Sequence, residues 1–143
     1  YGYHFPLNLK KLTLESFSWS AISSIGRLPN HEVLKLLGAK GYRVERWNME
    51  EGEFPKLKFL KLEALPVVKW TCSSDHLPCL QKLILHRCME LEELPSCLEE
   101  IPTLELIQVH RCPGSVGNLV QQIKEEQMNW GNVDLKILIL EEI

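Results

Sequence analysis

The 143-residue sequence lacks the features that mark a membrane-spanning, secreted or catalytic protein. No apolar run approaches the ~20 residues that a transmembrane helix needs. No Asn-x-Ser/Thr glycosylation site occurs, which is unusual for an extracellular repeat domain. The Gly-x-Ser-x-Gly, His-Glu-x-x-His and glycine-rich phosphate-loop motifs are also missing, so we expect no enzyme activity.

What the sequence contains is a phrase of leucine-like residues, Leu-x-x-Leu-x-Leu, which occurs six times and begins near residues 9, 31, 57, 80, 104 and 135. A period in the twenties with this phrase is typical of a leucine-rich repeat. Leucines three apart also fit a helix, but the next spacing of two places Leu12 and Leu14 on one side only in an extended chain. We therefore predict an α/β leucine-rich-repeat solenoid over residues 1–143, a horseshoe arc with a concave parallel sheet of about six short strands.

Equivalent residues of the phrases should stack behind this sheet. Leu60, Leu83 and Ile107 are the middle residues of three successive phrases and are expected to form one buried column. The same rule turns Leu138 of the last phrase inward and Ile137 outward.

The segments between the phrases are predicted to be irregular or 3₁₀ convex returns, with one helix near the C-terminus. Trp47, Trp70 and Trp130 fall in these returns, and we expect them to pack in the core on the convex side rather than contact a ligand. The helix is expected to start from an N-cap at Asn118 and to end at Gly131.

The five cysteines include no Cys-x-x-Cys pair. Cys88 and Cys112 each stand three residues after the last apolar residue of a phrase, where the repeat consensus turns an Asn or Cys inward. A disulfide framework is the alternative, but the remaining cysteines are irregularly spaced. We expect reduced, buried thiols and a cytoplasmic, reducing location.

Two identical triplets, His86-Arg87-Cys88 and His110-Arg111-Cys112, contain residue types that bind zinc. The inward leucines imply that both histidines point outward while both cysteines turn inward. Four ligands cannot converge from opposite faces, so we expect no metal site here.

Three stretches carry a family resemblance: Trp47–Leu62, the Cys-x-x-Leu-x-x-Leu-Pro return at Cys88–Pro95, and the ending from Cys112 to Ile137. They resemble the C-terminal repeats of the coiled-coil, nucleotide-binding, leucine-rich-repeat immune receptors of plants, especially of nightshade-like plants. His31 departs from this pattern, because it stands where a leucine is expected.

The resemblance implies a non-catalytic interaction and autoregulatory module of an intracellular immune receptor. It implies protein partners: the receptor's own switch domain, and a pathogen effector or a fellow receptor. It also implies that this chain is a fragment without a cofactor, and that ATP or ADP is bound by an upstream switch domain. A generic cytosolic leucine-rich-repeat scaffold or substrate adaptor is the alternative, which the upstream sequence would distinguish.

Charge and apolar residues both favour a protein partner for the concave face. Eight-residue windows from the start of each phrase total +3, while the rest of the chain totals −6. This excess is too small for nucleic acid but fits an acidic protein surface, and we expect no direct membrane contact. The expected contact surface is an apolar strip flanked by polar and basic residues, and its candidates are Phe59, Lys61, Lys82, Ile84, His86, Arg87, Leu106, Gln108, His110 and Arg111.

Overall fold

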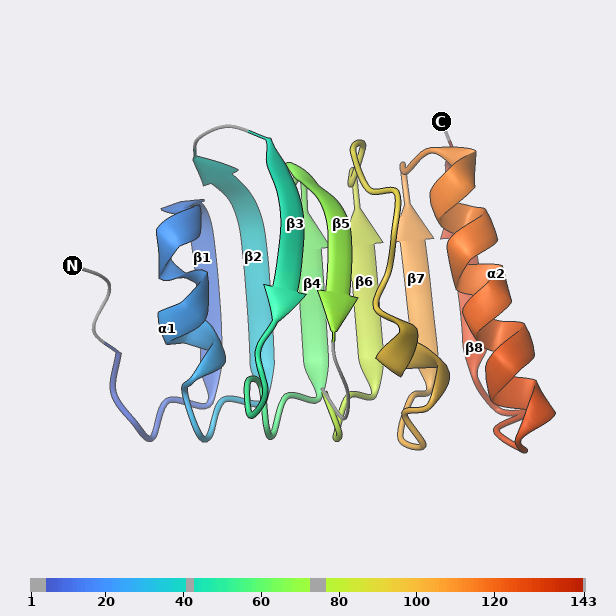
Figure 1. The fold of residues 1–143 in the computed structure, drawn as a ribbon, viewed down its shortest axis with the longest axis horizontal. Coiled ribbons are helices and arrows are strands. Elements are labelled where there is room, and N and C mark those ends of the chain that lie inside the picture. The colour runs from blue at the N-terminus through green and yellow to red at the C-terminus, as the bar shows by residue number, and fades with distance from the viewer. Residues whose placement is uncertain (1–4, 41–42, 73–76, 143) are drawn as a thin grey trace.

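The six phrases form the six strands of one parallel sheet in a computed structural model that describes residues 5–40, 43–72 and 77–142 (Figure 1). In spatial order the strands are β1 (Lys11–Ser18), β2 (Val33–Lys40), β4 (Phe59–Glu63), β6 (Lys82–His86), β7 (Leu106–His110) and β8 (Lys136–Leu140). Each strand pairs in parallel with the strand of the next phrase. The predicted α/β class with about six parallel strands is confirmed.

The inward side chains of this sheet stack as predicted. Leu60 is paired with Leu83, and Leu83 with Ile107, and all three side chains are buried. Burial alternates along β4, β6 and β7, because successive side chains of a strand point to opposite faces. The leucine-phase residues therefore face the core and the residues between them face away from it.

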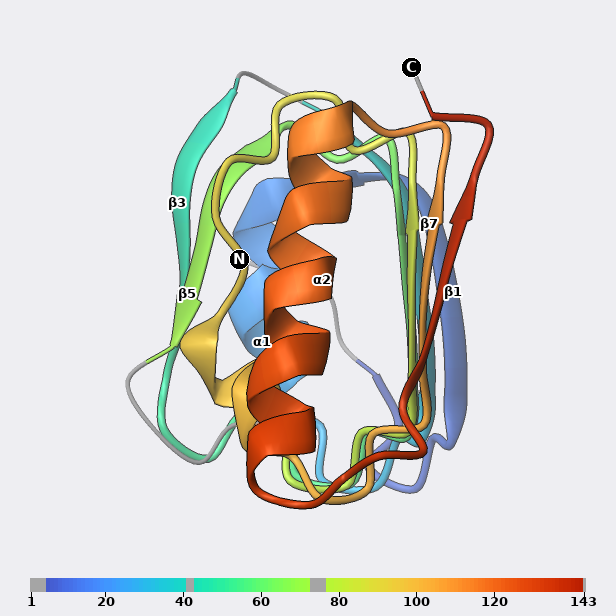
Figure 2. The same ribbon diagram turned by 90° about the vertical axis from the view of Figure 1, so that its right-hand side faces the viewer.

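A second layer covers the inward face of the sheet (Figure 2). It contains the short 3₁₀ helix η1 (Trp19–Ala21), helix α1 (Ile22–Gly26), strands β3 (Val44–Met49) and β5 (Val67–Cys72), and the 3₁₀ helix η2 (Ser96–Glu99). The prediction of only irregular or 3₁₀ returns was wrong here, because β3 and β5 pair in a parallel sheet of their own. None of the described elements covers the opposite face of the six-stranded sheet, which we call the open face.

The tryptophans of β3 and β5 form the centre of this second layer. Trp47 and Trp70 are buried and stack with their ring centroids 4.8 Å apart, which confirms their predicted place in the core. The prediction for Trp130 was wrong, because its side chain is 48% exposed. It follows the last residue of a helix at the edge of the molecule, where its Nε1–H donates to the Glu99 carbonyl at 2.7 Å.

The predicted C-terminal helix is present as α2 (Gly114–Asn129), but its expected N-cap was wrong. The helix begins directly after Pro113, four residues before Asn118, and Asn118 is an exposed residue inside it. Pro113 stands at the N-cap position with an extended backbone, and it makes no side-chain capping hydrogen bond. The early start brings Gly117 against β8, where a Cβ would lie 3.3 Å from Ile139 Cδ1.

The last phrase has a register that differs from the prediction by one residue. Ile137 pairs with the inward Ile107, while Leu138 pairs with the outward Gln108 and is 44% exposed. A shift of one residue moves every side chain of a strand to the other face. Leu135, Ile137 and Ile139 form an alternating apolar set, and the contact between α2 and Ile139 favours this set over the leucines.

The backbone supports the same register. For each strand of the sheet, the residue after the third outward position has a left-handed conformation, with φ from 47° to 76°. These residues are Ser16, Gly38, Ala64, Arg87, Arg111 and Glu141. Arg87 N–H donates to the His110 carbonyl at 3.0 Å, and Arg111 N–H donates to the Leu140 carbonyl at 3.0 Å. Glu141 is therefore equivalent to the two arginines.

Candidate protein-binding face

The structure brings all ten predicted contact residues to the open face or its edge. Eight of them occupy the outward positions of three adjacent strands: Phe59 and Lys61 in β4, Lys82, Ile84 and His86 in β6, and Leu106, Gln108 and His110 in β7. The other two, Arg87 and Arg111, follow β6 and β7 directly.

The apolar residues of this face lie on neighbouring strands. Phe59 and Leu106 share one row of the sheet with Lys82 between them, and Ile84 lies in the next row. Diagonal neighbours of this kind lie within reach of long side chains. The Lys35 ammonium also lies 5.8 Å from the centroid of the Phe59 ring, a distance that suits a cation–π contact.

Leu138 adds a fourth apolar residue to this set, on β8, in the row of Ile84 and Gln108. Sequence reasoning missed it, because the phrase spacing assigned Leu138 to the core. Its outward position follows from the pairing of β8 with β7, which the sequence does not show. We use the name apolar strip for Phe59, Ile84, Leu106 and Leu138.

A histidine pair lies beside the apolar strip. The rings of His86 and His110 stack with their centroids 4.6 Å apart. His86 Nδ1–H donates to Glu63 Oε1 at 2.8 Å, and the Lys61 ammonium lies 3.6 Å from the same oxygen. Although burial opposes the shift, the hydrogen bond and charge of His86, together with Lys61, lower the pKa of Glu63.

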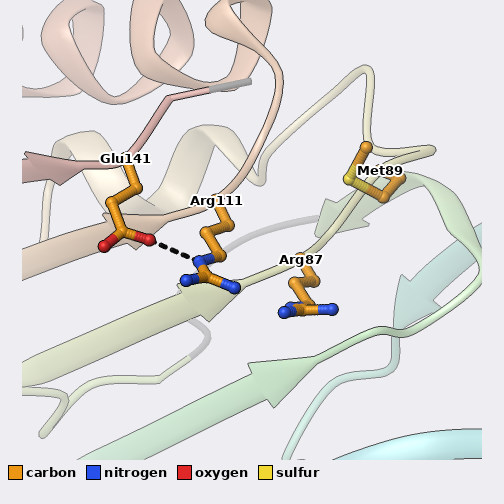
Figure 3. Close-up of a pocket in the computed structure, with 4 residues that line it drawn as sticks. All are labelled: Arg87, Met89, Arg111 and Glu141. Carbon is orange, nitrogen blue, oxygen red and sulfur yellow. Dashed lines mark hydrogen bonds and ion pairs between the residues drawn. The ribbon is translucent and has the colours of Figure 1, made fainter.

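Glu141 holds the second histidine and an arginine. Arg111 Nε–H donates to Glu141 Oε2 (Figure 3). His110 Nε2 lies 3.4 Å from the same oxygen. The hydrogen bond and charge of Arg111 lower the pKa of Glu141. Glu63 and Glu141 were not among the predicted contact residues, although Glu63 stands in the same outward row as the histidines.

The two cysteines of the triplets are buried on the other side of the sheet, as predicted. The Cys88 thiol donates to the Leu62 carbonyl at 3.5 Å, and Cys88 N–H donates to Cys112 Sγ at 3.4 Å. The hydrogen bond to Cys112 and burial raise the pKa of Cys88. All five cysteines are free thiols in the structure.

The triplets therefore do not bring their imidazoles and thiols to one point. Among the described residues, no group of three or more His, Cys, Asp or Glu side chains could hold a metal ion. The absence of zinc stays a prediction, which elemental analysis of the purified protein would check. In the part of the chain that the structure describes, no helix combines the length and the apolar character needed to cross a membrane.

Comparison with known sequences places this parallel-sheet repeat chain among the homologues of NLR-type disease resistance proteins of plants, which confirms the resemblance seen in the sequence. The relatives are late blight resistance proteins of Solanum demissum. The homolog R1B-16 is 40% identical over 114 residues, which are 79% of this chain and 9% of that protein. The homolog R1B-23 is 36% identical over 138 residues, which are 94% of this chain and 11% of that relative.

The chain thus spans about a tenth of the length of the curated relatives it matches. No family model matches it.

Proposed function

We propose that this chain is a leucine-rich-repeat solenoid segment of an intracellular plant immune receptor and serves there as a non-catalytic protein-interaction and autoregulatory module. Its partners are the receptor's own nucleotide-binding switch domain and a pathogen effector or fellow receptor, met in the cytoplasm. ATP or ADP belongs to that switch domain rather than to this chain. The homology to resistance proteins favours this function over a generic scaffold or substrate adaptor.

The observation that supports the proposal best is the apolar strip on the open face. Single exposed apolar residues are normal on protein surfaces, but a contiguous set on one face suggests a contact surface. Here Ile84, Leu106 and Leu138 lie on three adjacent strands, and Lys61, Lys82 and the two arginines surround them. A strip with this surround suits a partner whose contact surface is apolar at the centre and acidic at the rim.

The test is Ile84→Glu in the full receptor, with Met128→Glu as the matched control. Met128 is an exposed apolar residue on α2, so its substitution makes the same charge change away from the open face. Ile84→Glu should weaken co-precipitation of the switch domain or partner and leave the fold intact, because Ile84 points away from the core.

In leaves, disruption of an inhibitory interface by Ile84→Glu should appear as constitutive cell-death signalling. Disruption of a sensory interface should instead appear as a failure to recognise the pathogen. The proposal is wrong if the Ile84→Glu receptor is folded, signals normally and binds the switch domain and its partners as the control does.

A further inference from the structure

A cleft beside the histidine pair combines two arginines, one carboxylate and one exposed apolar side chain. Arg87, Met89, Arg111 and Glu141 line a space of about 490 Å³ (Figure 3). Figure 3 shows the two arginines side by side, with Glu141 on one side of Arg111 and Met89 beyond Arg87. A volume of this size is large enough for one or two amino-acid side chains.

The charges in this cleft are unequal. The Glu141 carboxylate accepts from Arg111 and also lies near His110, so its charge is already shared. The exposed Arg87 guanidinium forms no ion pair with any carboxylate in residues 5–40, 43–72 and 77–142. A second carboxylate, supplied by a ligand, would therefore pair with the charge of Arg87.

The backbone at these positions does not explain the arginines. Both have the left-handed conformation that every strand of the sheet shows at this point, with φ of 52° at Arg87 and 55° at Arg111. Gly38 occupies the corresponding position in β2, and glycine adopts this conformation at least cost. The fold itself therefore accepts a glycine here, and what the arginines add is their side chains.

We propose that this cleft binds the carboxylate of a Glu or Asp side chain in an extended acidic segment of a partner protein. Arg87 takes the carboxylate in a two-point hydrogen bond, the geometry for which a planar guanidinium is suited. Met89 is 49% exposed, and its flexible thioether side chain packs against an apolar neighbour of that residue. This assignment rests on the proposed interaction function, and it names the chemistry of the partner.

The same geometry favours a carboxylate over a phosphate. Arg111 already holds a carboxylate, so the cleft shows that this group fits between its walls. Arg111 and Glu141 already offset each other's charge, so the cleft has one uncompensated positive charge, that of Arg87. A single carboxylate matches this charge, whereas a dianionic phosphate would leave one negative charge unbalanced.

The experiment titrates the purified 143-residue chain with the peptide acetyl-Gly-Leu-Glu-Leu-Gly-amide and follows the arginine side-chain NMR signals. Counterparts with Gln or phosphoserine at the central residue serve as comparison ligands. Arg87→Gln should bind the Glu peptide about threefold more weakly, which is the scale of an exposed charge pair. Glu141→Gln should bind it more tightly, because the substitution removes the competing carboxylate and releases Arg111.

Arg46→Gln and Glu51→Gln are controls, since they make the same net-charge changes at exposed residues outside the cleft. Both should bind the Glu peptide as the wild type does. Backbone amide spectra of all four variants verify the fold.

The inference is overturned if the wild type binds the Glu and Gln peptides equally, or binds neither at millimolar concentration. It is also overturned if Arg87→Gln binds as the wild type does, or if the phosphoserine peptide binds more tightly than the Glu peptide. None of these results bears on Ile84→Glu, so failure of the cleft assignment can be distinguished from failure of the interaction function.

Discussion

At the scale of single residues, His31 is a polar side chain at a buried position. It occupies a leucine position of the second phrase, is fully buried, and lies with its ring centroid 5.8 Å from that of Phe54. Neither ring nitrogen has a hydrogen-bond partner in the structure. Burial lowers the pKa of His31, because the charged imidazolium is poorly solvated there.

His31→Leu should stabilise the protein, and more so at acidic pH. The pKa of His31 is lower in the folded state than the value of 6.5 expected when unfolded. The unfolded chain therefore binds the His31 proton more tightly than the folded chain does. The loss of stability from this difference is absent well above pH 6.5 and grows as the pH falls through 6.5 toward the folded pKa. Leucine also removes an unsatisfied buried N–H, a gain of about 1–3 kcal/mol at neutral pH.

Urea denaturation at pH 7.5 and pH 5.5 measures this effect. The stability difference between His31→Leu and the wild type should be larger at the lower pH. An equal difference at both pH values would show that His31 does not titrate as its burial implies.

At the scale of elements, the pairing of α2 with β8 determines which side chains of the last strand reach the open face. The contact of Gly117 with Ile139 holds the helix close to the strand, and Leu135 is fully buried beneath it. The outward Leu138 and Leu140 are each more than 40% exposed. This element therefore supplies one end of the apolar strip.

Lysine substitutions at two adjacent residues test the register of β8. Ile137→Lys should cost about 1–3 kcal/mol of unfolding free energy, because it places an ammonium on the core side. Leu138→Lys should change the stability by no more than about 0.5 kcal/mol, because its side chain is on the open face. Denaturant titration of both variants checks this, and a reversed order would restore the register predicted from the phrase spacing.

At the scale of the whole molecule, the buried residues form one continuous cluster from Phe17 to Leu135. The cluster includes the Trp47–Trp70 stack in the second layer and Val116, Val120 and Ile123 of α2. A core shared in this way should make the described chain unfold as one unit rather than phrase by phrase.

Leu83→Ala tests this cooperativity, because Leu83 lies in the middle of the sheet and is fully buried. The cavity should cost about 2–5 kcal/mol. Three of the four tryptophans, Trp19, Trp47 and Trp70, pack together in the second layer, so tryptophan fluorescence reports mainly on that layer. Far-ultraviolet circular dichroism reports mainly on α2. Both signals should shift to the same lower denaturant midpoint. A shift in only one of them would show that the second layer and α2 unfold separately.

The sequence by itself determined the strands and most of the face. A spacing of three and then two can place Leu60 and Leu62 on one side only in an extended chain, so the phrase fixes both the strand and its inward residues. The outward positions of Phe59, Ile84 and Leu106 follow from the same alternation. The inward turn of Cys88 and Cys112 also followed from local position, since it occurs at the same point of two phrases.

The tertiary structure alone decided where two local patterns competed. In the last phrase, Leu138 with Leu140 and Ile137 with Ile139 are equally apolar alternating sets, and only the packing of α2 on β8 selects between them. Residues distant in sequence also meet where β3 pairs with β5, and where the Glu141 carboxylate contacts both Arg111 and His110. Local spacing carries no information about such contacts, because their energy arises only when the distant segments meet.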